Sequence, residues 1–146
     1  VGVHAQGESD TIYKPHVFDR GSEAKEYTAK ELVAKATKSR GKWNRAKALH
    51  RDSYSYEYTI SSWAGFSTHY TVVVSGGTVV RFIREEVIME GDDIDRTKAR
   101  TMDELYESCI DDWLPRGESD NYLYLGLSDA GLLTMCGFTH KHCVDD

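Results

Sequence analysis

The residues best suited to chemistry in this 146-residue chain are the cysteines and histidines near its C-terminus. Cys136 and Cys143 lie in one short stretch with His140 and His142. The two cysteines could close a disulfide, or all four side chains could hold zinc, which binds thiolates and imidazoles in closed four-ligand sites. The spacing favours the disulfide, because the adjacent His142 and Cys143 would point apart on an extended segment. Free thiols are the third alternative.

Cys109 is the third cysteine, and an odd count leaves one thiol over after pairing. Its position in a predicted helix suggests a buried thiol. We therefore favour a bridge between Cys136 and Cys143, while a related pairing that includes Cys109 stays open. Because disulfides persist in oxidising compartments, the cysteines indicate a secreted, extracellular protein.

A second possible metal site is the acidic loop that contains Asp92, Asp93 and Asp95, whose carboxylates are ligands of the kind calcium prefers. The loop lacks the ligand order and the closing glutamate of an EF-hand, so a solvated turn is the favoured interpretation. We expect no cofactor, with zinc and calcium as the alternatives.

Catalytic signatures are weak. The chain has no Gly-x-Ser-x-Gly nucleophile and no glycine-rich phosphate loop after a predicted strand. Acid/base chemistry could arise if His69 faced Arg84 with Glu85 or Glu86 nearby, and Glu57 belongs to the same class. A surface pair across two strands is the favoured interpretation of these residues, so a non-catalytic protein is favoured over an enzyme.

Composition and charge describe an ordinary globular, acidic protein. Hydrophobic residues make up 40% of the chain, charged residues 29%, and the formal net charge is -6. Nucleic-acid binding depends largely on Lys and Arg, so we expect no nucleic-acid partner. No apolar run is long enough to span a membrane. We expect an N-terminal arm over residues 1–27 and a single α+β domain over residues 28–146.

Two capping boxes predict the helices. Residues 28–31 (Thr-Ala-Lys-Glu) open a helix that should end near His50, and residues 101–104 (Thr-Met-Asp-Glu) open one that Pro115 and Gly117 should end.

Alternating and β-branched segments predict the strands. One face of the first strand carries Tyr54, Tyr56, Tyr58 and Ile60, which form either the core of a sheet or a surface that stacks a sugar or peptide. Segments 68–75 and 78–84 form a hairpin around Gly76-Gly77, and segments 122–127 and 132–136 form another. The first hairpin should pair Val74 with Val79, Val72 with Arg81 and Tyr70 with Ile83, which places Arg81 on the core face.

The order arm-α-β-β-β-α-β-β indicates the α+β class. We expect an antiparallel sheet of about five strands with two helices packed on one face.

Several of these segments together resemble a loosely defined family of small secreted or lipid-anchored α+β domains of unknown function. The resemblance rests on Trp43, the Tyr-x-Tyr strand at 54–58, the glycine hairpin and the Thr-x-Asp-Glu-Leu-aromatic helix start at 101–106. It covers roughly residues 40–127. The chain departs from the family at its end, where the cysteine/histidine tail replaces a Gly-Tyr-Pro-type segment. The resemblance implies an exported protein and supplies no activity.

The leading functional hypothesis is a non-catalytic extracellular domain that binds a protein partner or self-assembles with copies of itself through sheet edges and the arm. Tyr13, Phe18 and Phe66 are the candidate interaction residues. A cystatin-like protease inhibitor or peptide binder is the alternative, on fold analogy alone. A metal-dependent enzyme that uses the C-terminal cysteine/histidine cluster is the third hypothesis.

Overall fold

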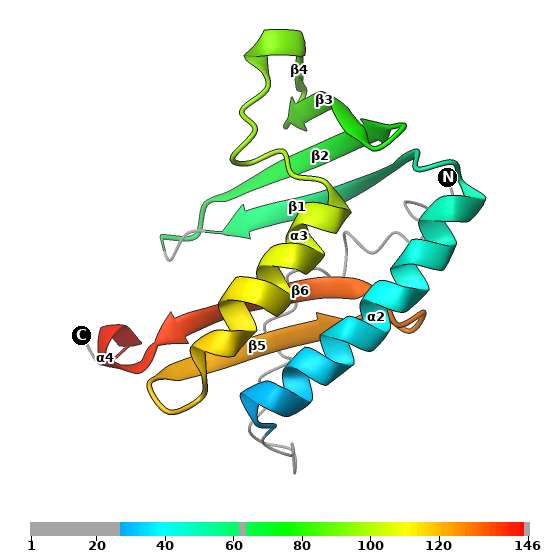
Figure 1. Ribbon diagram of the computed structural model, residues 1–146. Coiled ribbons are helices and arrows are strands. Elements are labelled where there is room, and N and C mark those ends of the chain that lie inside the picture. The colour runs from blue at the N-terminus through cyan, green and yellow to red at the C-terminus, as the bar shows by residue number, and fades with distance from the viewer. Residues whose placement is uncertain (1–26, 62–63, 145–146) are drawn as a thin grey trace. The chain divides into compact units, whose positions relative to one another are not determined.

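The computed structural model describes residues 27–61 and 64–144, with side chains up to His142, and it has the expected α+β class (Figure 1). Two main helices, Ala29–Leu49 (α2) and Met102–Ser108 (α3), accompany two antiparallel sheets, one of four strands and one of two. The described residues thus contain six strands in two sheets, where we expected about five in one. Both helices begin where the capping boxes predict.

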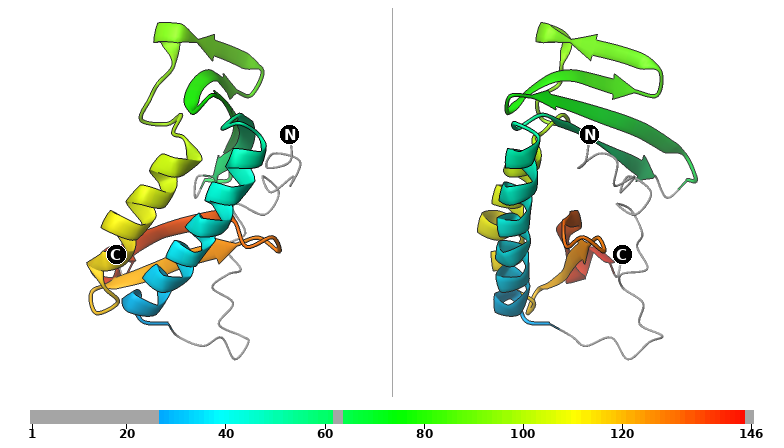
Figure 2. Two further views of the ribbon diagram at one scale, coloured as in Figure 1. Left: turned by 45° about the vertical axis from the view of Figure 1, so that its right-hand side comes forward. Right: turned by 90° about the vertical axis from the view of Figure 1, so that its right-hand side faces the viewer.

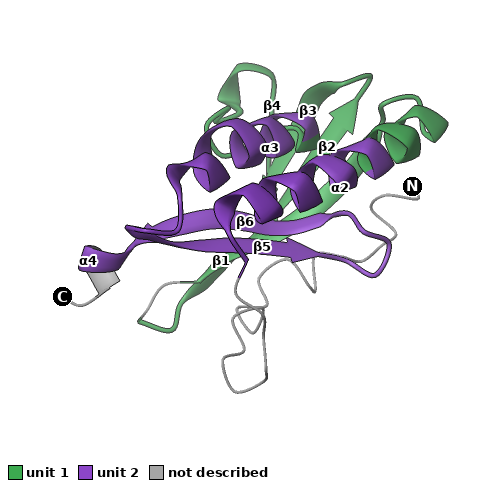
Figure 3. Cartoon of the chain, turned by 60° about the horizontal axis from the view of Figure 1, so that its bottom comes forward, with its two compact units in different colours: residues 1–13, 43–102 green, residues 14–42, 103–146 purple. Residues whose placement is uncertain are grey.

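The chain divides into two compact units (Figure 3). Among the described residues, unit 1 holds Trp43–Met102, and unit 2 holds residues 27–42 and 103–144. The single domain expected over residues 28–146 stays a prediction. No helix in the described part of the chain is both long and apolar enough to cross a membrane.

Unit 1 is built on the four-stranded sheet, in which sequential strands are neighbours (Figure 2). The strands are Tyr54–Ser61 (β1), Ser67–Ser75 (β2), Thr78–Arg84 (β3) and Val87–Glu90 (β4), followed by a 3-10 turn, Gly91–Asp93 (η2). Gly76 and Gly77 form the expected turn between β2 and β3, both with positive φ, 58° and 86°. The sequence did not predict β4.

A bulge between β2 and β3 changes the register that we expected. Val74 lies opposite Val79 as predicted, but Val73 lies opposite Arg81, so Val80 is an extra residue on β3. Phe82 therefore pairs with Val72 and is buried. The predicted register was wrong beyond Val79, because a period of two cannot reveal one extra residue.

Of the face predicted to be either core or binding surface, Tyr54 and Tyr56 lie in the core of unit 1, Tyr58 is half-buried and Ile60 is exposed. The hydroxyl groups of the three tyrosines hold the segment 98–102. Alternate residues of β1 bond alternate residues of that segment. Met102 N–H donates to the Tyr54 hydroxyl (2.9 Å), and the Tyr56 hydroxyl donates to the Arg100 carbonyl. The Tyr58 hydroxyl donates to the Lys98 carbonyl (2.8 Å). We call these three bonds the tyrosine comb.

Aromatic rings continue this core across the sheet. Tyr58 stacks on Tyr70 of β2 with ring centroids 4.9 Å apart, and Tyr70 stacks on Phe82 of β3 at 5.3 Å. Trp43, in the last part of α2, meets Tyr54 edge-on at 4.7 Å. Such contacts add to the free energy gained from area burial alone.

Unit 2 combines the first part of α2 and most of α3 with a hairpin of two strands. The strands are Asn121–Leu127 (β5) and Leu133–His140 (β6). Helix α3 continues as a π turn, Cys109–Trp113 (η3), and a 3-10 turn, Leu114–Arg116 (η4), and a short helix, Lys141–Val144 (α4), follows β6. Gly117, at φ 88°, ends the helical run at the residue that the sequence indicated.

The N-terminus of α2 carries the predicted capping box. Thr28 N–H donates to the Glu31 carboxylate (3.0 Å), and Glu31 N–H donates to the Thr28 hydroxyl (3.2 Å). Ala29 N–H donates to the Glu118 carboxylate at 3.1 Å. This amide hydrogen bond holds the pKa of Glu118 below its ordinary value.

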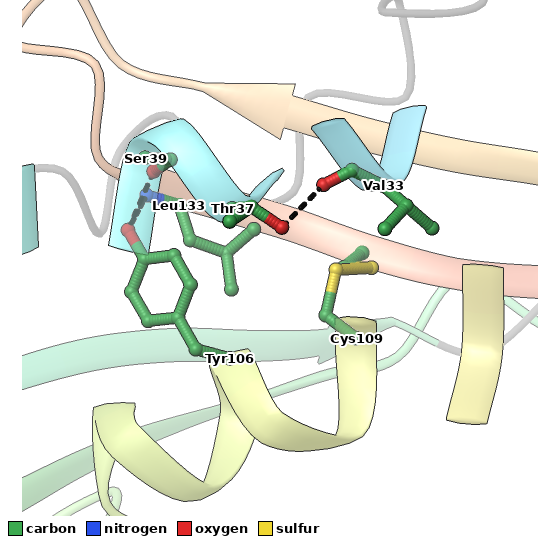
Figure 4. Close-up of a disulfide and its surroundings, with 7 residues drawn as sticks. Val33, Thr37, Ser39, Tyr106, Cys109 and Leu133 are labelled. Atoms are coloured by element: carbon green, nitrogen blue, oxygen red, sulfur yellow. Dashed lines mark hydrogen bonds between the residues drawn. A yellow bond between two sulfur atoms is a disulfide. The ribbon is translucent and has the colours of Figure 1, made fainter. Parts of the chain in front are cut away.

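A buried chain of hydrogen bonds joins the elements of unit 2 through Tyr106 (Figure 4). The Leu133 amide donates to the Tyr106 hydroxyl (2.8 Å), and the Ser39 hydroxyl donates to the Gly131 carbonyl (2.7 Å). Tyr106 and Ser39 are 2.7 Å apart, and because the Ser39 proton is already used, Tyr106 donates in that pair. This series of hydrogen bonds therefore links α2, α3 and both ends of the Gly131–Leu133 segment.

Removing one tyrosine hydroxyl of the comb should destabilise the protein clearly only where the backbone group that it bonds is buried. Tyr54→Phe leaves the Met102 N–H without its acceptor, and we expect the free energy of unfolding to fall by about 1–3 kcal/mol. Tyr58→Phe is the matched control: the Lys98 carbonyl can bond water instead, so a loss below about 0.5 kcal/mol is expected. Urea unfolding measures both losses of free energy. Equal losses for the two variants would contradict the claim that the Met102 amide has no other acceptor.

The Tyr106 phenol should make stability depend on alkaline pH. Burial raises the pKa of Tyr106 above the ordinary 10.0, against the opposing effects of its hydrogen bonds with the Ser39 hydroxyl and the Leu133 amide. Above pH 10 the unfolded chain ionises this phenol and the folded chain does not, so stability is complete below pH 10 and falls as pH rises further, by up to about 1.4 kcal/mol per unit. Urea unfolding between about pH 8 and 11 should give Tyr106→Phe a shallower decline than the unchanged protein. Parallel declines would contradict the assignment.

Candidate functional site

His69, on the polar face of the four-stranded sheet, is the centre of a polar cluster in unit 1. Its Nε2 lies 2.6 Å from Oε1 of Glu57, and its Nδ1 lies 3.3 Å from the Thr59 hydroxyl. Both partners are on β1, where Thr59 is directly opposite His69. The ring is thus held at both nitrogens by the neighbouring strand.

The backbone of His69 is held by the turn between β3 and β4. Glu85 N–H donates to the His69 carbonyl (2.8 Å), and His69 N–H donates to the Glu85 carboxylate (2.9 Å). Glu85 has a positive φ of 55°, which is uncommon for a residue with a long side chain. The two hydrogen bonds to His69 offset the cost of this conformation.

The order hydroxyl, imidazole, carboxylate in this cluster is the order of a nucleophile, its base and the group that orients the base. Catalysis also needs donors aimed at developing charge and a site that encloses the substrate. The His69 side chain is instead 42% exposed on an open sheet face. We therefore assign the cluster a positioning role, in which it fixes the β3–β4 turn against β1 and β2.

The acid/base group suggested by the sequence is only partly brought together. Glu57 and Glu85 do contact His69, but Arg84 does not face it. Arg84 lies opposite Tyr70, on the other face of the sheet, because the bulge at Val80 moves every later residue of β3 by one position.

Strand β4 is an outer edge of the four-stranded sheet. The hydrogen bond from Glu85 N–H to the His69 carbonyl shows which backbone groups of β4 point away from the sheet. Because Glu85 N–H points at β2, the preceding residue, Arg84, turns its backbone groups toward β4, where it pairs with Val87. Alternation then directs Val87 and Met89 at β3. The N–H and C=O groups of Ile88 and Glu90 face outward, with no strand beside them in the described residues.

Apolar side chains accompany this open edge. Val87 is 58% exposed and Ile88 is 59% exposed. Ile88 pairs with Ile83 of β3 on the same face as the His69 cluster. We call β4, with the outward groups of Ile88 and Glu90, the binding edge. The sequence missed it because Glu85-Glu86 lacks the Gly or Asn that usually marks a two-residue turn.

A disulfide is present, but its pairing differs from the one that we favoured. Cys109 bonds Cys136, with 5.8 Å between their Cα atoms (Figure 4). Strand β6 extends through His140, so the four residues after Cys136 lead about 13 Å away from it, too far for a local bridge unless the chain turned back. Cys109 is not a leftover thiol, and the Cys143 side chain lies outside the described residues.

Of the residues proposed for zinc, Cys136 is used by the disulfide and offers no thiolate. His140 and His142 still lie next to each other. The rings of His140 and His142 have centroids 5.1 Å apart, and His142 N–H donates to Nδ1 of His140 (3.2 Å). Within the described side chains, no group of three or more His, Cys, Asp and Glu residues could hold a metal ion.

The acidic residues suggested for calcium lie around the turn after β4. Asp92 and Asp93 belong to η2. Asp95 accepts hydrogen bonds from the Thr97 hydroxyl (2.6 Å) and amide (3.0 Å), which lower the pKa of its carboxyl. Asp95 is therefore occupied in a local turn, which agrees with the interpretation of this loop as a solvated turn.

Of the three apolar residues suggested for an interaction surface, Tyr13 and Phe18 lie outside the described residues. Phe66, in the β1–β2 connection, is 77% exposed.

Comparison of the chain with protein-family models, with curated proteins and with solved structures found no match.

Breaking the disulfide should destabilise the protein more than removing the third cysteine. The bridge joins residues 27 apart, for which loop entropy corresponds to about 3–4 kcal/mol of stability. We expect that loss in urea unfolding of the double variant Cys109→Ser/Cys136→Ser, and almost none for Cys143→Ser. A non-reducing digest should contain a linked Cys109–Cys136 peptide. A Cys136–Cys143 peptide would contradict the pairing.

Proposed function

We propose that this chain is a non-catalytic, exported domain that binds protein by accepting an extended strand at its binding edge. The observation that carries the proposal is the outward backbone of Ile88 and Glu90 beside the exposed side chains of Val87 and Ile88. Strand addition to an open sheet edge obtains affinity from main-chain hydrogen bonds and selectivity from alternate side chains.

Export is supported by the Cys109–Cys136 disulfide, since such bonds persist in oxidising compartments. The bond lies between a buried helical cysteine and a strand residue, so it contributes to the stability of unit 2. This use of two cysteines is more typical of a structural disulfide than of a redox site.

Strand pairing is supported by the exposed apolar side chains along the edge. Proteins usually shield an exposed edge with proline, inward charge or a covering segment. Strand β4 carries two exposed apolar residues, Val87 and Ile88, and its neighbour β3 contributes Ile83 to the face that carries Ile88. The incoming strand comes from another protein or from a second copy of this chain. No observation on the described residues favours the cystatin-like or the metal-dependent alternative.

A peptide titration tests the proposal. The probe is a short peptide with an alternating Thr-Val core and two glutamines at each end, followed by the amide signals of the ¹⁵N-labelled protein. We expect shifts concentrated at Ile88 and Glu90. Ile88→Pro should abolish binding while leaving the β3–β4 bonds intact, because the N–H of Ile88 points outward. Ile88→Ala removes the same apolar side chain but keeps this donor, so it should weaken binding only a few-fold.

A second peptide tests main-chain pairing with the unchanged protein. The same peptide with N-methyl groups on alternate residues has lost the donors needed for strand pairing, and it should not bind. The proposal is wrong if methylation and Ile88→Pro both leave binding unchanged, or if the Ile88 and Glu90 signals shift neither with this peptide nor with versions that end in Lys or Glu pairs instead of glutamines.

A further inference from the structure

We infer that the strand received at the binding edge is a basic segment of another protein, with an apolar centre and Lys or Arg at its ends, and not a second copy of this chain. This inference rests on the proposed strand addition at β4. It names the partner by charge and residue pattern.

Carboxylates surround the binding edge and outnumber the available cations. Residues 81–96 contain six carboxylates and three arginines. Two of these arginines already have partners: Arg81 pairs with Glu90 (3.4 Å), and Arg96 donates to the Val79 carbonyl (2.9 Å). Among the described residues, Glu86 and Asp92 have no cation within ion-pair distance, although both are exposed at the two ends of β4.

The same carboxylates oppose pairing between two copies of β4. Outward residues must meet outward residues in an antiparallel pair, so two symmetric registers overlap three of the four residues of β4. One places Ile88 opposite Ile88 of the second copy, and Glu86 then meets Glu90. The other places Ile88 opposite Glu90, and Glu86 then meets Asp92. Each register brings two pairs of carboxylates together per dimer, and like charges destabilise a cross-strand contact. The repulsion is greater in the second register, because in the first register each Glu90 keeps Arg81 as its partner.

A basic strand reverses the sign of these contacts. Its ends would lie near Glu86 and Asp92, where opposite charges attract. Its central residue would lie beside Ile88, which with Ile83 forms an apolar spot between the two acidic ends. The pattern of charge, apolar residue and charge along β4 therefore selects the complementary pattern in a partner.

Three peptides that share the Thr-Val core and end in Lys, Gln or Glu pairs test this inference. At low salt, about 0.02 M, we expect the lysine peptide to bind about tenfold more tightly than the glutamate peptide, with the glutamine peptide between them. At about 0.5 M salt the three affinities should converge, because these charges are exposed and screened.

Matched variants separate a local charge effect from the net charge of the protein. Glu86→Gln/Asp92→Asn should remove the preference for lysine while the glutamine peptide still binds. Glu107→Gln/Asp111→Asn removes the same charge from exposed positions of unit 2, and it should leave the preference unchanged.

The outcomes distinguish this inference from the proposal on which it rests. Equal affinity for the three peptides at low salt overturns the basic partner but leaves strand addition standing. A dimer in sedimentation that Ile88→Pro abolishes also overturns it, because a second copy would then be the occupant. Absence of binding by all three peptides overturns the proposed function itself.

Discussion

The single extra residue at Val80 is the constraint on which the four-stranded sheet depends. It turns Phe82 into the core and Arg81 outward, and every later residue of β3 and β4 follows that choice. An unbulged hairpin would expose Phe82, forfeiting about 2–3 kcal/mol of burial, and would bring a guanidinium toward an apolar interior. The bulge also separates Arg84 from His69 and lets Arg81 reach Glu90 on β4. One backbone irregularity thus decides which side chains the outer strand presents.

Much of this fold can be predicted from local chemistry. The capping boxes locate the starts of both helices because such a box can satisfy amide groups within four consecutive residues, as Thr28 and Glu31 do, and this is a local requirement. The alternation from Tyr54 to Ile60 identifies a strand with one buried face, since side chains point to opposite sides of a sheet in turn. Gly76 and Gly77 mark their turn because few other residues adopt positive φ so readily.

The features that the sequence did not disclose depend on contacts between distant residues. Glu85 adopts a turn conformation that its residue type disfavours because His69, on another strand, bonds it twice. Cys136 bonds Cys109 instead of the cysteine nearer in sequence, because β6 carries the chain away in extended form. The binding edge could not be predicted for two reasons. Strand β4 begins at the unrecognised Glu85-Glu86 turn, and the direction of its N–H and C=O groups depends on the pairing of β2, β3 and β4. Proximity in sequence was a poor guide at each of these places.

The tyrosine comb has a consequence for the order in which unit 1 folds. Neighbouring strands of its sheet are consecutive in the chain, so their pairing closes only short loops. The comb joins residues 40 to 48 positions apart, and such distant contacts cost more chain entropy to form. The sheet can therefore assemble before the segment 98–102 is bonded to the tyrosine hydroxyls. Until those bonds form, the segment 98–102 is not held against the sheet, and a partly folded chain of this kind is open to aggregation.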